Sequence, residues 1–140
     1  MVQPSSVSVT RSTSTGQALR ARLPHAVRRT LTEFQRRALA LFPGEISQII
    51  LYGSYARGEA TPDSDVDVMV VGRWHTPRRY LGGPGDSRWR KLINAAMDSM
   101  VTGGPFISVL VVGEDLFNSG FSVAEEAKDE GRLLWALPRT

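Results

Sequence analysis

The chain of 140 residues has no cysteine, which excludes both disulfides and thiolate-bound metals from its fold and its chemistry. It also has no run approaching the roughly 20 apolar residues of a membrane-spanning helix. Its N-terminus lacks the apolar segment that is typical of a secretion signal. These absences predict a cytoplasmic protein without a membrane span.

Apolar residues are scarce at the N-terminus, where residues 1–17 contain five serines and three threonines. Such a segment has too little apolar surface to offset the entropy of ordering it. We therefore predict a disordered tail over 1–17 and one domain over 18–140. The hydrophobic content of 41% is enough for a single core in a chain of this length.

The apolar pattern of the domain predicts an α/β fold. Runs rich in β-branched residues indicate strands near 46–52, 66–71, 106–112 and 132–136. Helical spacing of apolar residues indicates helices near 24–41 (Val27, Leu31, Phe34, Ala38, Leu41) and 87–102 (Trp89, Leu92, Ile93, Ala96, Met97, Met100). A short connection joins the first two strands, whereas a helix precedes the third. We therefore expect a small mixed sheet packed with helices.

Two carboxylates at the start of the second strand are the strongest chemical signal. Asp65 and Asp67 are separated by one residue, so in a strand they project from the same face, roughly 6.6 Å apart, while Val66 and Val68 point into the core. Mg²⁺ prefers oxygen ligands and often takes one or two carboxylates together with substrate phosphates. The pair therefore predicts a magnesium site.

A glycine-serine turn after the first strand suggests a phosphate-binding loop. Gly53 permits close approach of the backbone to a ligand, and Ser54 supplies a hydroxyl and opens a short helix whose free N–H groups favour phosphate. The turn-forming residues 61–64 then return the chain beside the first strand. We expect the turn and the carboxylates to face each other across one cleft.

Aspartates at 63, 65 and 67 also resemble the opening of a calcium loop. That loop needs glycine at its sixth position and glutamate at its twelfth, where this chain has Val68 and Trp74. The calcium-loop interpretation therefore fails, and Asp63 is better explained as a turn residue.

The pattern Gly53-Ser54-x-Ala56-Arg57-Gly58, followed by Ser64-Asp65-x-Asp67, resembles the signature of the minimal nucleotidyltransferases of the polymerase-beta-like superfamily. Weaker similarity extends through 106–117 and 130–135. The superfamily includes antitoxins that pair with HEPN-domain proteins. The resemblance implies a nucleotidyltransferase fold, with Asp65 and Asp67 as catalytic metal ligands.

The function implied by this resemblance is Mg²⁺-dependent transfer of a nucleoside monophosphate, with AMP from ATP favoured, to a hydroxyl of a protein or RNA. Gly53 and Ser54 would hold the leaving phosphates. Arg57 would either contact phosphate or pair with an acid such as Asp63 and hold the loop. The alternative is a catalytically weak or inactive antitoxin-like module that binds a HEPN-type partner.

One departure from the family pattern separates these two functions. Active members of the superfamily generally carry a third carboxylate on a neighbouring strand, where it can act as general base. The corresponding strand here, 105–112, has no acid, and Phe106 or Ser108 occupies the expected position. A third ligand would have to come from elsewhere, with Glu114 and Asp115 the nearest acids in sequence.

Two basic regions lie outside this motif. Arginines cluster on or before the first helix (Arg20, Arg22, Arg28, Arg29, Arg36, Arg37). Such a patch could attract RNA or an acidic partner. A solvated helix face is the simpler explanation, because no aromatic residues lie between the arginines to stack on bases. The second basic region is the segment 72–86, which contains Arg73, Arg78 and Arg79 and is rich in glycine. We predict that it is a long loop beside the metal site, which could close over a ligand. His75 in this loop is expected to be solvated.

Overall fold

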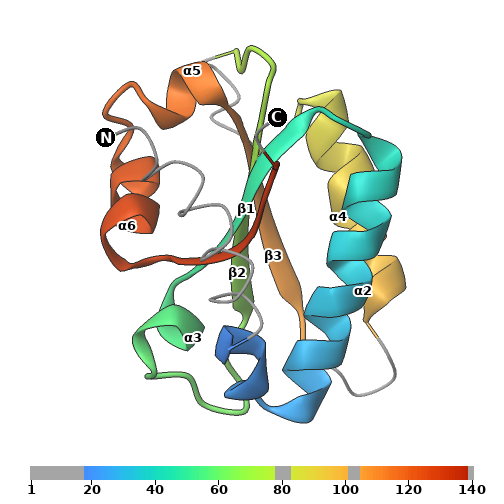
Figure 1. Ribbon diagram of the computed structural model, residues 1–140, viewed down its shortest axis with the longest axis vertical. Coiled ribbons are helices and arrows are strands. Elements are labelled where there is room, and N and C mark those ends of the chain that lie inside the picture. The colour runs from blue at the N-terminus through green and yellow to red at the C-terminus, as the bar shows by residue number, and fades with distance from the viewer. Residues whose placement is uncertain (1–17, 78–82, 101–104, 139–140) are drawn as a thin grey trace.

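The computed structural model describes residues 18–77, 83–100 and 105–138, so the predicted tail over 1–17 lies outside the described residues. Its centre is one four-stranded sheet in the order β3-β2-β1-β4 (Figure 1). β2 is antiparallel to β1 and parallel to β3, and β4 is antiparallel to β1. The predicted mixed sheet is therefore confirmed. The strands are β1 (Ile46–Tyr52), β2 (Val66–Gly72), β3 (Ile107–Gly113) and β4 (Arg132–Ala136).

Helices cover both faces of the sheet (Figure 1). The two long helices, α2 (His25–Leu41) and α4 (Ser87–Ser99), lie side by side on one face, close to the predicted ranges. The short helices α5 (Glu114–Phe117) and α6 (Ser122–Glu130) lie on the other face, and α3 (Ser54–Arg57) follows β1 directly. We did not predict α6, because its small apolar side, formed by alanines, gives a weak periodic signal.

Alternate residues of β2 point to the two helical layers. Val66, Val68 and Val70 join the core beneath α2 and α4. Met69 and Val71 join the smaller core beneath α5 and α6. A strand buried on both faces has a continuous apolar sequence. By the same alternation Asp67 lies on the α5 and α6 side of the sheet.

Two residues of the predicted apolar stripes are exposed. Leu41 at the end of α2 is 44% exposed, and Met97 of α4 is 55% exposed. The buried side of α4 is instead formed by Leu92, Ala95, Ala96 and Ser99. These positions follow i, i+3, i+4 and i+7 spacing, which turns the buried side away from Met97. The sequence prediction was wrong at Met97 because the buried side includes Ala95 and Ser99, whose small side chains give little hydrophobic contrast, whereas the larger Met97 adds to the apolar pattern.

In the described ranges, no helix is long and apolar enough to cross a membrane.

Candidate functional site

The turn after β1 has the conformation that its glycine allows. Gly53 has φ 75°, ψ −155°, and its carbonyl oxygen accepts hydrogen bonds from the N–H groups of Ala56 and Arg57, both at 3.1 Å. Gly58, also at positive φ, ends α3. Positive φ is strained for residues with a Cβ, so glycine is favoured at both positions. The predicted strand, turn and short helix are present.

A second turn brings the chain back beside β1. Ser64 Oγ accepts a hydrogen bond from the Thr61 N–H at 2.8 Å, and the Ser64 N–H donates to the Thr61 carbonyl oxygen at 3.0 Å. Asp63 lies exposed in this turn, as predicted. The turn sets the register of the following antiparallel pair, in which Tyr52 lies opposite Asp67.

This register places the glycine turn against the second carboxylate. A Cβ added to Gly53 would lie 2.2 Å from Asp67 Oδ2, far inside van der Waals contact. The turn and Asp67 therefore face each other, as the sequence suggested. Asp65 is exposed and lies directly before β2. Because alternate residues of an extended chain point to the same side, its side chain is expected on the same side as that of Asp67.

The surroundings of Asp67 disfavour the negative charge of its carboxyl group. Burial raises the pKa of this carboxyl group, and the negative charges of Asp65 and Glu126 raise it further, while Arg57 lowers it. A bound cation would reverse the balance by favouring the ionised form. Two carboxylates beside a glycine that leaves no room for a side chain thus form a donor set that suits Mg²⁺.

β3 provides no acid to complete this site. Ser108 lies beside Asp67 in the parallel register, and the carbonyl oxygen of Phe106 accepts a hydrogen bond from the Val66 N–H at 2.9 Å. The Phe106 side chain is 45% exposed. Within the described part of the chain, no cluster of three or more histidine, aspartate or glutamate side chains could hold a metal ion.

Glu114 and Asp115 cannot supply the third acid. They follow Gly113, which pairs with Gly72 at the far end of β2. Five residues of strand separate that end from Asp67, roughly 17 Å. Asp115 there contacts His75, with 2.5 Å between Asp115 Oδ2 and Nδ1 of the imidazole.

The loop 72–86 was predicted to lie beside the metal site, but its described start, 72–77, lies at the other end of β2. The loop leaves the end of β2, whereas Asp65 and Asp67 lie at its start. His75 is solvated as expected, with 77% of its side chain exposed. Residues 78–82 of this loop lie outside the described ranges.

Arg57 joins α3 to α6 through ion pairs. Its guanidinium lies 2.9 Å from Glu59, 3.4 Å from Glu130 and 3.8 Å from Glu126. These acids, rather than the anticipated Asp63, are its partners among the described residues. The hydrogen bond and charge of Glu59 raise the pKa of Arg57, so it is a permanent cation next to the glycine-serine turn.

Three further residues beside the site were not identified from the sequence. Tyr52 faces Asp67 from β1, and Glu126 of α6 acts electrostatically on both. Arg132 at the start of β4 donates a hydrogen bond from Nε to the Ala56 carbonyl oxygen, at 3.4 Å. All three reach the site through contacts between distant segments, for which the sequence carries no local signal.

Arg132 and Arg57 also line a hollow beside α3, with a volume of about 260 Å³. Arg22, Tyr55 and Gly58 line it as well. The three arginines give this side of the turn a positive rim, and Arg57 among them acts on the charge of Asp67.

Comparison with known proteins identifies relatives over most of the chain. A family model described as "Nucleotidyltransferase domain" matches residues 27–132. A "Putative protein adenylyltransferase" of Methanocaldococcus jannaschii is 30% identical over 109 residues, which cover 76% of this chain and 96% of that protein.

Two solved structures also match at low sequence identity. One is described as a "putative nucleotidyltransferase from Sulfolobus solfataricus", with 15% identity, a TM-score of 0.46 and coverage of 82% of this chain and 90% of the other. The second is described as a "toxin-antitoxin with AMP-PNP", with 18% identity, a TM-score of 0.48 and coverage of 74% and 72%.

Proposed function

The chain belongs to the nucleotidyltransferase domain family, and from this premise we propose that it transfers AMP from ATP to a hydroxyl group of a protein, with Mg²⁺ bound at Asp65 and Asp67. The observation that carries the proposal is the packing of Gly53 against Asp67 Oδ2. The name of the 30% identical archaeal relative supports protein as the acceptor class and adenylyl as the transferred group.

In the proposed reaction, the acceptor oxygen attacks the α-phosphorus of ATP and forms a new phosphoester bond. The bond between the α-phosphorus and the oxygen bridging to the β-phosphate breaks, and pyrophosphate leaves. The hydroxyl proton passes to solvent, since β3 offers Ser108 in place of a base. When bound, Mg²⁺ would neutralise charge on the phosphate oxygens and help hold the attacking and leaving groups in line.

The residues of the chain would bind and orient the triphosphate. Because Gly53 has no side chain, the Asp67 carboxylate packs directly against the backbone of the turn, so phosphate held by the turn would lie beside this carboxylate. Ser54 offers its hydroxyl to the leaving phosphates. Because α3 has only four residues, its dipole is small and the contribution of the hydroxyl and the turn N–H groups is the larger one. Arg57 would hold α3 against α6 and add positive charge near the β- and γ-phosphates.

A second candidate function is favoured by one observation, the serine beside Asp67 on β3. Without a third carboxylate, nucleotide binding can persist while transfer is slow, because the general base contributes typically 10²–10⁴-fold to rate. In that case the domain acts as an antitoxin-like module that binds a protein partner, for which a HEPN-type protein is our candidate.

The deciding experiment incubates the protein with α-labelled ATP and Mg²⁺, with and without candidate acceptor proteins, and compares wild type with an Asp65→Asn/Asp67→Asn variant. The proposal predicts label on protein in the wild-type reaction and none with the variant or with EDTA. Asp63→Asn is the matched control, because Asp63 is an exposed turn acid two residues away.

The outcomes separate the two candidate functions. Transfer that survives in the Asp65→Asn/Asp67→Asn variant contradicts the proposed site. Magnesium-promoted ATP binding without label transfer favours the binding module. Ser108→Asp then tests the missing acid, because a new carboxylate beside Asp67 should raise the transfer rate if the absence of a base limits it.

A further inference from the structure

A groove between α2 and α4 lies on the face of the sheet opposite Asp67. One hollow of about 460 Å³ lies between the C-terminal half of α2 and the middle of α4. A second, of about 540 Å³, continues it toward the start of α2. The two share Arg37 and Asp98, so they form one groove along both helices.

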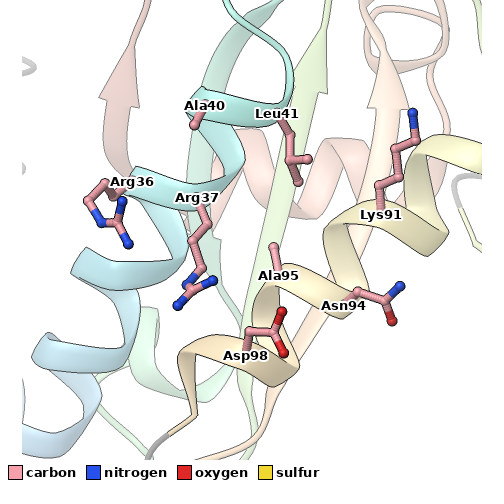
Figure 2. Close-up of a pocket in the computed structure, with 8 residues that line it drawn as sticks. All are labelled: Arg36, Arg37, Ala40, Leu41, Lys91, Asn94, Ala95 and Asp98. Atoms are coloured by element: carbon pink, nitrogen blue, oxygen red, sulfur yellow. The ribbon is translucent and has the colours of Figure 1, made fainter.

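The groove has an apolar floor at one end. Figure 2 shows Leu41 and Ala95 pointing toward each other between the helices, with Arg37 and Asp98 next to them. Leu41 is 44% exposed although it is aliphatic and sits at the end of an otherwise buried stripe. An exposed leucine between two helices offers a contact for an apolar side chain of a partner.

The rim of the groove is basic. Among the described residues, five basic side chains line it, against two acidic ones (Arg28, Arg29, Arg36, Arg37, Lys91; Glu33, Asp98). Glu33 is shared between Arg36, at 2.5 Å, and Arg37, at 2.8 Å, so one carboxylate serves two cations. Lys91 lies over the ring of Phe42, with its Nζ 5.9 Å from the centroid, a contact that leaves its positive charge uncancelled.

These features favour protein over nucleic acid as the occupant. Of the described residues that line either hollow, none is aromatic, so among them bases would find no side chain to stack on. A floor with leucine and alanine, bounded by arginine and lysine, complements a helix that has leucines on one side and acids along its edges.

The acidic helix of a second copy fits the groove less well. In α6, Glu126 and Glu130 are already paired with Arg57, and Glu125 with Lys128. The alanines of α6 are buried in its own domain and its partly buried Val123 packs against the same core, so it has little apolar surface to place on Leu41. Docking of this kind would also be head-to-tail and tend toward open filaments.

We infer that the α2 and α4 groove binds an acidic amphipathic helix of a partner protein. Because Asp67 lies on the opposite face of the sheet, the partner leaves the nucleotide site open. The groove therefore positions a protein beside the domain, and only the identification of that protein as the acceptor rests on the proposed function.

The test uses a fluorescent helical peptide as long as α2, with leucines along one side and glutamates flanking them. Wild-type protein should bind it, and binding should weaken with rising salt. The Arg29→Glu/Lys91→Glu variant reverses two charges of the rim and should bind about tenfold more weakly. Arg73→Glu/Arg90→Glu is the matched control, because it changes the net charge equally at exposed residues that line neither hollow.

Several outcomes would overturn the inference. The first is that the control variant loses as much peptide binding as the Arg29→Glu/Lys91→Glu variant. The second is that a peptide with lysines in place of the glutamates binds wild type as tightly as the acidic peptide. The third is that a uridine oligonucleotide binds more tightly than the acidic peptide. A self-association in sedimentation that disappears in the Arg29→Glu/Lys91→Glu variant would also overturn it, by assigning the groove to a second copy.

Titration of both variants with Mg²⁺ and ATP separates this inference from the proposed function. Unchanged nucleotide binding in the Arg29→Glu/Lys91→Glu variant, together with weakened peptide binding, supports a docking groove distinct from the site. Failure of ATP to bind wild type while the peptide binds contradicts the proposed function alone. Thermal unfolding of each variant identifies any loss that comes from misfolding.

Discussion

At the scale of single residues, Gly53 is the position at which one added methyl group would have the largest effect on the site. Its φ of 75° is strained for alanine, and the new Cβ would collide with Asp67 Oδ2 at 2.2 Å. We expect Gly53→Ala to lower the free energy of unfolding by about 2–4 kcal/mol, combining backbone strain with overpacking. Magnesium-dependent ATP binding should be lost, as measured by calorimetry.

Gly58→Ala provides the comparison within the same motif. Gly58 has φ 74°, but an added Cβ would have no atom within 4 Å. The substitution carries backbone strain alone, about 1–2 kcal/mol, and should leave nucleotide binding nearly unchanged. If Gly53→Ala and Gly58→Ala changed the free energy of unfolding and ATP binding equally, the contact between Gly53 and Asp67 would have no role.

Tyr52 gives the site a measurable pH dependence. Burial, followed by the charges of Asp67 and Glu126, raises the pKa of its phenol to about 12. In the unfolded chain the phenol ionises near its ordinary value of about 10. The folded state then binds the proton more tightly, so the contribution of Tyr52 to stability is present below pH ~10 and is lost as the pH rises toward 12.

The prediction is that ultraviolet titration finds one tyrosine that ionises last and that Tyr52→Phe removes. Asp67→Asn should lower the pKa of this phenol, because it removes one of the two negative charges that act on it. An unchanged titration in Asp67→Asn would place the two side chains too far apart to interact.

At the scale of elements, α4 depends on its N-cap. Asp86 is 5% exposed, and its Oδ1 accepts a hydrogen bond from the Arg88 N–H at 2.9 Å. Asp86→Ala should reduce the free energy of unfolding by about 1–2 kcal/mol, as measured by urea denaturation. Asp98→Ala, at an exposed residue of the same helix, should change it by less than about 0.5 kcal/mol. A similar loss in both variants would argue against a specific cap.

The elements themselves were largely predictable from local patterns. Strand β1 was placed at its observed bounds, and α2 was placed within one residue of its first residue. Their signals come from neighbours in sequence: β-branched runs for the strand and Val27, Leu31 and Phe34 at helical spacing for the helix. α6 was missed because its buried side is formed by Ala124 and Ala127, whose small side chains give little periodic contrast.

At the scale of the whole molecule, ligand binding should couple to stability. A ligand that binds only the folded state stabilises it by about 2.7 kcal/mol at one hundred times its dissociation constant. For a domain of this size, ATP with Mg²⁺ should therefore raise the melting temperature by roughly 5–10 °C. EDTA should abolish the increase. An increase of the same size with ATP and EDTA would mean that the carboxylates hold no metal.

The candidate site and the groove differ in local charge. The glycine-serine turn faces Asp67, whose burial and neighbouring acids Asp65 and Glu126 disfavour its negative charge. The α2 and α4 groove on the other face is mainly basic. A negatively charged nucleotide thus needs a cation to bind at the first face, whereas an acidic protein segment is attracted directly to the second.

The sequence by itself determined the strands, the glycine-serine turn and the spacing of Asp65 and Asp67, because each depends on residues close together in the chain. It also showed that β3 carries no acid. Only the tertiary structure decided that Gly53 packs against Asp67, and that Arg57 pairs with Glu59, Glu126 and Glu130. It also decided that Glu114 and Asp115 lie at the end of the sheet far from Asp67. These outcomes depend on strand register and on packing between distant segments, to which no local pattern in the chain corresponds.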